Sequence, residues 1–335
     1  MNKIKTFFLI SAFISFSALS CLFLDILAYA DKSASADNSK KVVVILPGQN
    51  LSTIASYLDN TGIIKNPLKF KLLARIKGCD KKIKAGEYLL SSSMPPIKIL
   101  ETMASGKVCL YKITIPEGYN LEQVASIIAK AELCAKADFL KAATNSSFVY
   151  KQGINAETFE GYLFPETYHF PKNITPEKII AAMVERFRSI FNPEWKKRAK
   201  DLNLSIHQVV ALASIIEKET GVSFERPVIS SVFHNRLKKR MRLESDPTVI
   251  YGLKNFNGNI TRKHLTAKTP YNTYIIKGLP PGPIANPGIK ALKAALYPAD
   301  TDFLYFVSKK DRTHKFSANI KNHNKAVKRY QLHKQ

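Results

Sequence analysis

The sequence predicts an α+β protein that has an N-terminal transmembrane helix, a small α/β subdomain and a mixed α+β domain. Residues 7–24 carry no charge, and eighteen such residues are just enough to span a bilayer. Beyond them, short β-type runs such as residues 42–46 alternate with segments whose apolar residues recur at helical spacing. A chain of 335 residues is long enough for about two domains, each with its own core.

The N-terminal run has two interpretations. As an uncleaved anchor, it has a cytoplasmic end at residues 1–6, where Lys3 and Lys5 stay inside, and a transmembrane segment at residues 7–30. As a signal peptide, it is cleaved after Ala30, because Ala28 and Ala30 form a small-x-small site. The run is long for a signal peptide, which favours the anchor. Residues 31–41 lack apolar periodicity and predict a linker that lifts the next domain off the membrane.

The composition is strongly basic, with 51 Lys and Arg against 26 Asp and Glu and a net charge of +25. Such a charge indicates a polyanionic neighbour or simply a solvated basic surface. No Arg-rich block or zinc-finger spacing is present, so nucleic acid is not favoured as a partner. Beyond the N-terminal run, Cys79, Cys109 and Cys134 allow one disulfide or three buried thiols, of which buried thiols are favoured, and no Cys/His cluster suggests a metal.

An internal repeat organises residues 42–150. Residues 46–55 (LPGQNLSTIA) are echoed by residues 115–125 (IPEGYNLEQVA), with Leu51 aligned to Leu121. In both, a β run leads through a Pro/Gly turn into a helix that begins at Asn-Leu. This is the general shape of a LysM-like sugar-binding unit, although the pattern alone favours a generic βα repeat.

Residues 151–335 are expected to form the mixed domain. Helices are predicted at residues 176–191, 205–221, 224–240 and 289–296, and a hairpin joins strands at 303–307 and 314–316. Residues 245–248 (SDPT) predict a turn, and the Pro/Gly-rich residues 270–288 a long functional loop. The aromatic and polar run at residues 159–170 suits either a carbohydrate groove or packing at a domain junction.

Glu217 is the candidate catalytic residue of the helix at 205–221. It falls on the apolar face of this helix, whereas Glu219 is expected to point away from that face. Burial without a partner would raise the pKa of the Glu217 carboxyl and make it a proton donor near neutral pH. The alternative is a structural ion pair with Arg226, Arg236 or Arg242.

Several motifs occur in order and together resemble the MltG (YceG-like) endolytic murein transglycosylases. The similarity runs from about residue 42 to residue 330. The motifs are 84–88 (KAGEY), 103–106 (MASG), 160–165 (EGYLFP), 217–220 (EKET), 233–237 (FHNRL), 242–252 (RLESDPTVIYG), 270–274 (PYNTY), 278–288 (GLPPGPIANPG) and 304–307 (LYFV). One departure is Glu244, where the family often has Gln.

The resemblance implies a lytic transglycosylase that cleaves the bond between N-acetylmuramic acid and N-acetylglucosamine without water, with Glu217 as its acid and base. It also implies a single-pass inner-membrane protein with a LysM-like subdomain and a periplasmic catalytic domain. Peptidoglycan strands are then the partner, beside the peptidoglycan synthases, and neither metal nor organic cofactor is needed. The residues expected to bind substrate are Asn235, Ser245, Asp246, Thr248, Tyr271, Asn272 and Glu166.

Two functions of other classes compete with this one. A non-catalytic peptidoglycan-binding scaffold would use the repeats for binding and Glu217 for structure. A membrane-tethered binder of anionic polymers would rely on the net charge of +25 and would lose affinity steeply as salt is added.

Overall fold

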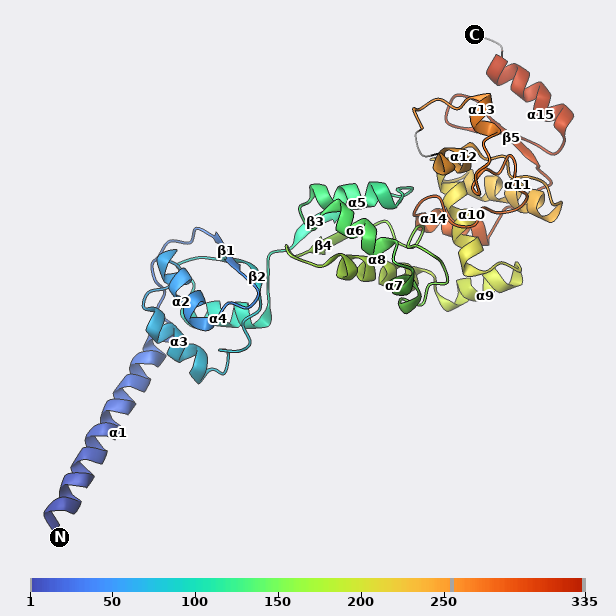
Figure 1. Cartoon of the computed structure of the whole chain (residues 1–335). Coiled ribbons are helices and arrows are strands. Elements are labelled where there is room, and N and C mark those ends of the chain that lie inside the picture. The colour runs from blue at the N-terminus through green and yellow to red at the C-terminus, as the bar shows by residue number, and fades with distance from the viewer. Residues whose placement is uncertain (1, 254–255, 333–335) are drawn as a thin grey trace. The chain divides into compact units, whose positions relative to one another are not determined.

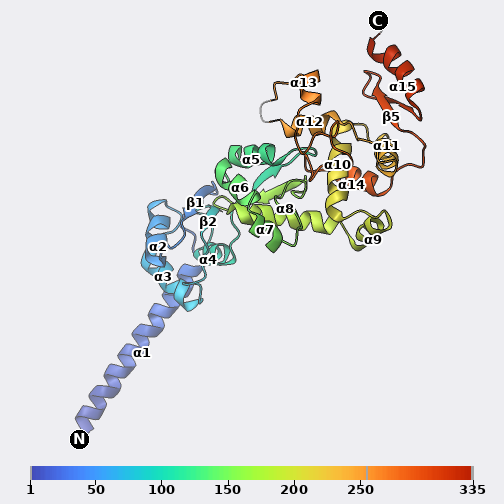
Figure 2. The ribbon, with the colours of Figure 1, turned by 45° about the vertical axis from the view of Figure 1, so that its right-hand side comes forward.

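A computed structural model describes residues 2–253 and 256–332 (Figures 1 and 2). The contacts divide the chain into two compact units. Unit 1 contains the residues up to Tyr111 together with Pro171–Asn173. Unit 2 contains Lys112–Phe170 and the chain from Ile174 onward. Each unit is mixed α and β and has a hydrophobic core of its own, and the division falls after Tyr111, whereas the sequence places it after residue 150.

Unit 1 begins with the long helix α1 (Asn2–Ala30), whose stretch Lys5–Ala30 is long and apolar enough to cross a membrane. Most of its large apolar side chains are exposed, which is compatible with a single-pass anchor. Its last turns differ, because Ile26 and Tyr29 are buried in the core of unit 1. Asp25 also forms an ion pair with Lys69 at 2.7 Å. The C-terminal end of this helix is therefore part of the folded unit.

The rest of unit 1 is a strand–helix–helix–strand arrangement followed by one more helix. Strand β1 (Lys41–Ile45) pairs antiparallel with β2 (Gly86–Leu90), with Val43 opposite Tyr88. Between them lie α2 (Leu51–Asn60) and α3 (Pro67–Ile76), and α4 (Pro96–Ser105) follows β2. The segment expected to be a linker is hydrogen-bonded to the loop after β2. Ser35 donates its backbone N–H to the Ser92 carbonyl, and Asp37 accepts at its carbonyl from Ser93 N–H, at 3.0 and 3.1 Å.

Unit 2 opens with a second version of this arrangement. Strands β3 (Tyr111–Thr114) and β4 (Thr167–Phe170) form one sheet. The helices α5 (Leu121–Lys130), α6 (Lys136–Ala143) and the short α7 (Ser146–Lys151) connect them. The predicted repeat is therefore present in three dimensions.

The two copies match in detail at their first helices. Each helix has ten residues and is capped by an Asn side chain, which accepts from the backbone N–H of Thr53 in α2 and of Gln123 in α5. Each is preceded by a glycine at positive φ, Gly48 at 81° and Gly118 at 76°. The structure confirms the alignment of Leu51 with Leu121.

The remainder of unit 2 is mainly helical, and its helices pack around α10. The predicted helices and hairpin strands are present within a few residues of the expected bounds. The elements are α8 (Pro176–Ile190), α9 (Pro193–Asp201), α10 (Ile206–Glu219), α11 (Arg226–Lys238), α12 (Asp246–Gly252), α13 (Arg262–Leu265), α14 (Ile289–Leu296), β5 (Tyr305–Ser308), β6 (His314–Ser317), α15 (Ile320–Val327) and a π-helical turn at Lys328–Leu332.

Two expectations need correction, and one choice between two roles is settled. Residues 246–252 form the helix α12 rather than a turn, because Pro247 in a first helical turn suits a helix start as well as a turn. The aromatic side chains of Phe159, Tyr162 and Phe164 are buried in the core, so packing is their role rather than contact with carbohydrate. All four cysteines are free, Cys21 is exposed, and the other three are partly exposed rather than buried.

Candidate functional site

Helix α10 carries the two carboxylates of residues 217–220 to one end of the core of unit 2. The helix begins with a capping box, in which Gln208 N–H donates to Ser205 Oγ at 3.1 Å and Ser205 N–H donates to Gln208 Oε1 at 2.9 Å. Its residues 209–216 are all buried, and α14 packs along it. The helix ends at Glu219 because Thr220 adopts an extended conformation.

Glu217 forms a buried ion pair with Arg226 of α11. Arg226 Nη2 donates to Glu217 Oε1 at 2.8 Å, and the side chains are only 5% exposed at Glu217 and 6% at Arg226. Gly288 donates its backbone N–H to the other carboxylate oxygen at 2.9 Å. Both oxygens are thus occupied by protein donors, which is the arrangement of the structural ion pair that the sequence left open.

The negative charge of Glu217 affects the pKa of the neighbouring Glu117. Burial, and then the negative charge of Glu217, raise the pKa of the Glu117 carboxyl, while the positive charges of Arg226 and Lys290 act in the other direction. Glu117 also lies where a side chain at residue 288 would be, so a Cβ there would collide with its carboxyl group. Gly288 is therefore needed for this close approach.

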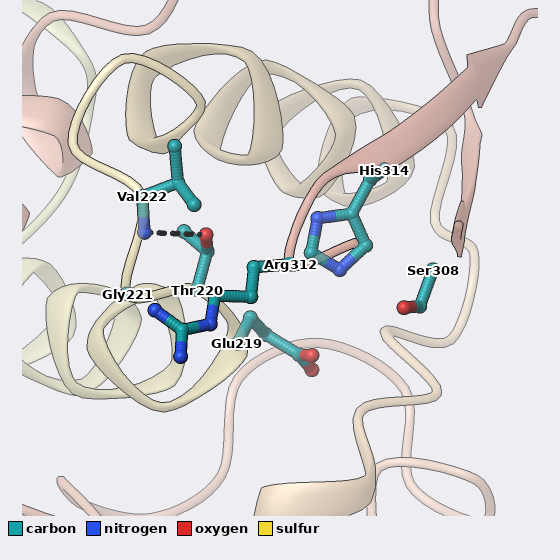
Figure 3. A pocket seen from close by; sticks show the side chains of 7 residues that line it. All are labelled: Glu219, Thr220, Gly221, Val222, Ser308, Arg312 and His314. Atoms are coloured by element: carbon teal, nitrogen blue, oxygen red, sulfur yellow. Dashed lines mark hydrogen bonds between the residues drawn. The ribbon is translucent and has the colours of Figure 1, made fainter. Parts of the chain in front are cut away.

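Glu219 lies in a cavity of about 400 Å³, here called the Glu219 cavity (Figure 3). Its walls are residues 219–222 after α10 and residues Ser308, Arg312 and His314 of the β5–β6 hairpin. Glu219 Oε1 accepts a hydrogen bond from the Ser245 hydroxyl. The carboxyl group is therefore enclosed, whereas helical spacing predicts that it points away from the core. The reason is that other segments, the residues before α12 and the hairpin, cover that side of α10.

The surroundings of Glu219 raise its pKa so far that both the protonated and the ionised form are populated near neutral pH. Burial raises the pKa of the Glu219 carboxyl to about 7, and the nearby negative charge of Asp246 adds to the rise. The Ser245 hydrogen bond and the positive charge of Arg236 oppose it. A carboxyl group with this pKa, at the wall of a cavity, can both donate and accept a proton at neutral pH.

The turn before α12 positions Ser245 for this contact. Glu244 adopts a positive φ of 50°, and Ser245 N–H donates to Thr273 Oγ1 at 3.0 Å. Ser245 occupies the N-cap position of α12, yet its hydroxyl makes no cap hydrogen bond and binds Glu219 instead. Glu244, where the family often has Gln, lies half-exposed and pairs with Arg236 at 3.1 Å.

The hairpin wall of the cavity is held by a second buried carboxylate. Glu225 accepts from both the backbone N–H and the ring Nδ1 of His314, at 2.8 and 2.7 Å. Arg312 adopts a positive φ of 70° in the loop of the hairpin and faces the same space as Glu219 (Figure 3). The sequence predicts the hairpin but gives no signal that its loop lies beside residues 219–222.

Two of the residues expected to bind substrate lie beside Glu219, namely Ser245 and Asp246. Asp246 is exposed and accepts at Oδ1 from the hydroxyl of Tyr274 at 2.7 Å. These side chains add polar groups near the Glu219 carboxyl.

The other expected residues have different surroundings. Asn235 donates to the Thr301 and Phe303 carbonyls, Thr248 to the Ser245 carbonyl, and Asn272 to the Leu265 and Ala267 carbonyls, so these three side chains hold loops. Glu166 forms an ion pair with Arg186 of α8. Tyr271 lines a different cavity of unit 2, together with Glu160. Across residues 2–253 and 256–332, no group of three or more His, Cys, Asp or Glu side chains is arranged to hold a metal ion.

Comparisons with known proteins agree on one family. The model of the YceG-like family matches residues 43–329. A protein of Bacillus subtilis named endolytic murein transglycosylase is 37% identical over 314 residues, which cover 88% of this chain and 86% of that protein. A protein of the same name from Streptococcus pneumoniae is 30% identical, and its match covers 81% of this chain and 55% of its own length. A crystal structure of a yceG-like protein from Listeria monocytogenes superposes with a TM-score of 0.61 at 36% identity, covering 86% of this chain and 99% of that one.

Proposed function

The chain belongs to the YceG-like family, and on this basis we propose that it is an endolytic murein transglycosylase, a lytic transglycosylase that acts on peptidoglycan. The observation that carries the proposal within the chain is the Glu219 carboxyl group. It lies in a cavity of about 400 Å³, has a pKa raised to about 7, and is flanked by Ser245 and Asp246. Such a group is suited to proton transfer on a polysaccharide at neutral pH.

A single carboxyl group is sufficient for the proposed reaction. Protonated Glu219 gives its proton to the glycosidic oxygen as the bond from this oxygen to the anomeric carbon of N-acetylmuramic acid breaks. The 6-hydroxyl of the same sugar attacks the anomeric carbon, and the Glu219 carboxylate takes the proton that this hydroxyl releases. A 1,6-anhydro ring forms, no water is consumed, and Glu219 is protonated again.

We place the acid and base at Glu219 rather than at Glu217, the residue expected from the sequence. Each oxygen of Glu217 already accepts one hydrogen bond, from Arg226 or from Gly288, and its side chain is only 5% exposed, which leaves little room for a substrate oxygen beside it. Asp246, which is exposed beside Glu219, supplies negative charge for the positive charge that develops on the sugar ring in the transition state. Glu217 then has the role of joining α10 to α11.

We further propose that α1 anchors the chain in the cell membrane and that both units lie on the extracytoplasmic side. Lys3 and Lys5 precede the apolar stretch, which favours an inward N-terminus. The antiparallel pair β1–β2 with two intervening helices supports a LysM-like, glycan-binding role for unit 1. An anchored enzyme of this kind would act on nascent strands near the peptidoglycan synthases and end their elongation.

The test is digestion of purified peptidoglycan by the full-length chain in detergent. The full chain is needed because the end of α1 is buried in unit 1. Wild type should release strands with anhydromuramyl ends, detected by mass spectrometry. Glu219→Gln should lose this activity by about 10²-fold or more, while Glu217→Gln, assayed at a temperature where it is folded, should keep most of it.

Three results would contradict the proposal. Activity that requires Glu217 but not Glu219 would mean that Glu217 is the catalytic acid and base. Reducing ends in place of anhydro ends would mean a hydrolase with a second carboxylate. Binding to peptidoglycan without any product, in wild type and both variants alike, would make the chain a scaffold.

A further inference from the structure

A second cavity of unit 2, of about 550 Å³, is not used by the proposed chemistry. It is called here the Glu160 cavity, and its walls include Glu160, Thr158, Tyr271, His207 and Pro281. It shares no residue with the Glu219 cavity. Its volume falls in the range of roughly 300–1,000 Å³ that is usual for sites of small molecules.

The carboxyl group of Glu160 forms part of the wall of this cavity, and the Gly161 N–H near it favours its charged form. The residue is 5% exposed, and its Oε2 accepts from Leu121 N–H at 3.2 Å and from the Tyr251 hydroxyl at 3.0 Å. Its Oε1 is buried and has no hydrogen-bond partner among the residues that the structure describes. Burial raises the pKa of this carboxyl to about 7. A buried polar atom without a partner is costly, so it calls for an explanation.

The walls around Glu160 are held in place by groups that are already paired. Gly161 adopts a φ of 85°, and a Cβ at this position would collide with Pro283 and Val210, so only glycine fits. His207 Nε2 must donate to the Pro281 carbonyl, at 2.8 Å, and its Nδ1 then accepts from the Tyr162 hydroxyl at 2.9 Å. With these pairs satisfied, the polar side chains left on the walls are those of Glu160, Glu157, Thr158 and Asn155.

Aromatic and proline surfaces complete the cavity. The ring of Tyr271 lies 4.8 Å from that of Tyr251, tilted by 60°, and Pro270 and Pro283 add flat apolar surface. A flat apolar surface beside a carboxyl oxygen suits a sugar ring, whose apolar face packs on the surface while a hydroxyl or acetamido N–H donates to the oxygen.

The position of the cavity relates it to the proposed reaction. His207 lies at the start of α10 and Glu219 at its end, twelve residues later, so they are about 18 Å apart along the helix. A single sugar ring cannot reach both positions, whereas an extended oligosaccharide can. Resting on the proposed function, we propose that the Glu160 cavity binds an N-acetylated sugar ring of the strand, remote from the bond that is cleaved at Glu219.

The experiment measures binding as a function of strand length. Peptide-free glycan strands of two, four, six and eight sugars are titrated calorimetrically into full-length protein in detergent, in a Glu219→Gln background that prevents cleavage. Affinity should rise with length and level off once a strand reaches both cavities. Glu160→Gln keeps the size of the side chain and an oxygen for Tyr251 and Leu121, but replaces the other carboxyl oxygen with an amide donor. It should weaken binding of the longest strand about tenfold and leave the shortest unchanged.

Two further variants make the result decisive. Tyr271→Leu should weaken long strands in the same selective way, and it tests the cavity independently if Glu160→Gln is unstable to heating. Glu122→Gln removes the same charge from an exposed position on α5 and should bind like the background protein. Wild-type length dependence in folded Glu160→Gln and Tyr271→Leu would overturn the inference. Selective loss in these variants, in a chain that yields no anhydro ends, would support the site and reject the proposed reaction.

Discussion

The hydroxyl of Ser245 donates a hydrogen bond to Glu219, although Ser245 occupies the N-cap position of α12, where a serine side chain normally accepts from the backbone of its own helix. Helix α12 therefore lacks that cap hydrogen bond. Its first turn is stabilised instead by Pro247 and by the Thr248 hydroxyl, which donates to the Ser245 carbonyl at 2.6 Å. The hydroxyl therefore serves the carboxyl group of α10, and it is one of the groups that set the pKa of Glu219.

Ser245→Ala should move the alkaline side of the pH–rate profile to higher pH. The hydroxyl stabilises the charged form of Glu219, so its loss raises the pKa of this carboxyl. Initial rates of anhydro-end formation between pH 5 and pH 9 measure the change. Ser126→Ala on the exposed face of α5 is the control and should leave the profile where it is. A shift to lower pH would mean that the hydroxyl stabilises the neutral acid.

Asp246→Asn should move the same side of the profile in the opposite direction. The negative charge of Asp246 raises the pKa of Glu219, so its removal lowers this pKa and leaves less protonated acid at neutral pH. Asn still offers an oxygen to the Tyr274 hydroxyl, which keeps the local contact. The rate should also fall, since Asp246 would no longer stabilise positive charge on the sugar. An unchanged profile would exclude electrostatic coupling between the two residues.

Glu217→Gln should lower the free energy of unfolding by about 3–5 kcal/mol, because it removes the carboxylate that is paired with the buried Arg226 guanidinium. Thermal unfolding followed by circular dichroism at pH 7 measures the loss. Glu185→Gln, which breaks an exposed ion pair with Arg188, should cost less than about 1 kcal/mol. Equal effects of the two substitutions would show that the Glu217 pair adds nothing beyond a surface pair.

Glu219→Gln should raise the free energy of unfolding at neutral and alkaline pH. The folded protein keeps the Glu219 proton up to about pH 7, whereas the unfolded chain releases it near the ordinary value of 4.5. Wild-type stability from this group therefore falls as pH rises from about 4.5 to 7, and Gln avoids that loss. The variant should match wild type near pH 4 and exceed it by about 1–3 kcal/mol above pH 7. A pH-independent difference would contradict the raised pKa.

Gly161→Ala should destabilise unit 2 more than Gly62→Ala destabilises unit 1. Both glycines have a positive φ, 85° and 73°, which costs a residue with a Cβ about 1–2 kcal/mol. Only at Gly161 would the new methyl group also collide with Pro283 and Val210. Denaturant unfolding of the two variants measures the difference, and equal losses would mean that Pro283 moves away freely.

Local signals were enough to predict most of the fold. The capping box of Ser205 and Gln208 marks the start of α10, and the shared Asn-Leu start marks the two strand–helix–helix–strand copies. The site was harder to predict, because helical spacing shows which face of α10 meets its own core but not which loops cover the other face. Glu219 is enclosed by Ser245 and by the hairpin that bears His314, and these contacts span 26 and 95 residues of sequence. The Ser-Asp-Pro sequence at 245–247 was the one sequence feature that indicated polar residues near the Glu219 carboxyl group.

Because Ile26 and Tyr29 are buried in the core of unit 1, the N-terminal helix is joined rigidly to this unit and not through a flexible linker. Residues 33–37 do not act as a flexible linker either, because they are hydrogen-bonded to Ser92 and Ser93. If α1 lies in the bilayer, unit 1 is therefore held next to the membrane. Cleavage after Ala30 would remove three buried residues, Ile26, Tyr29 and Ala30, from the core of unit 1.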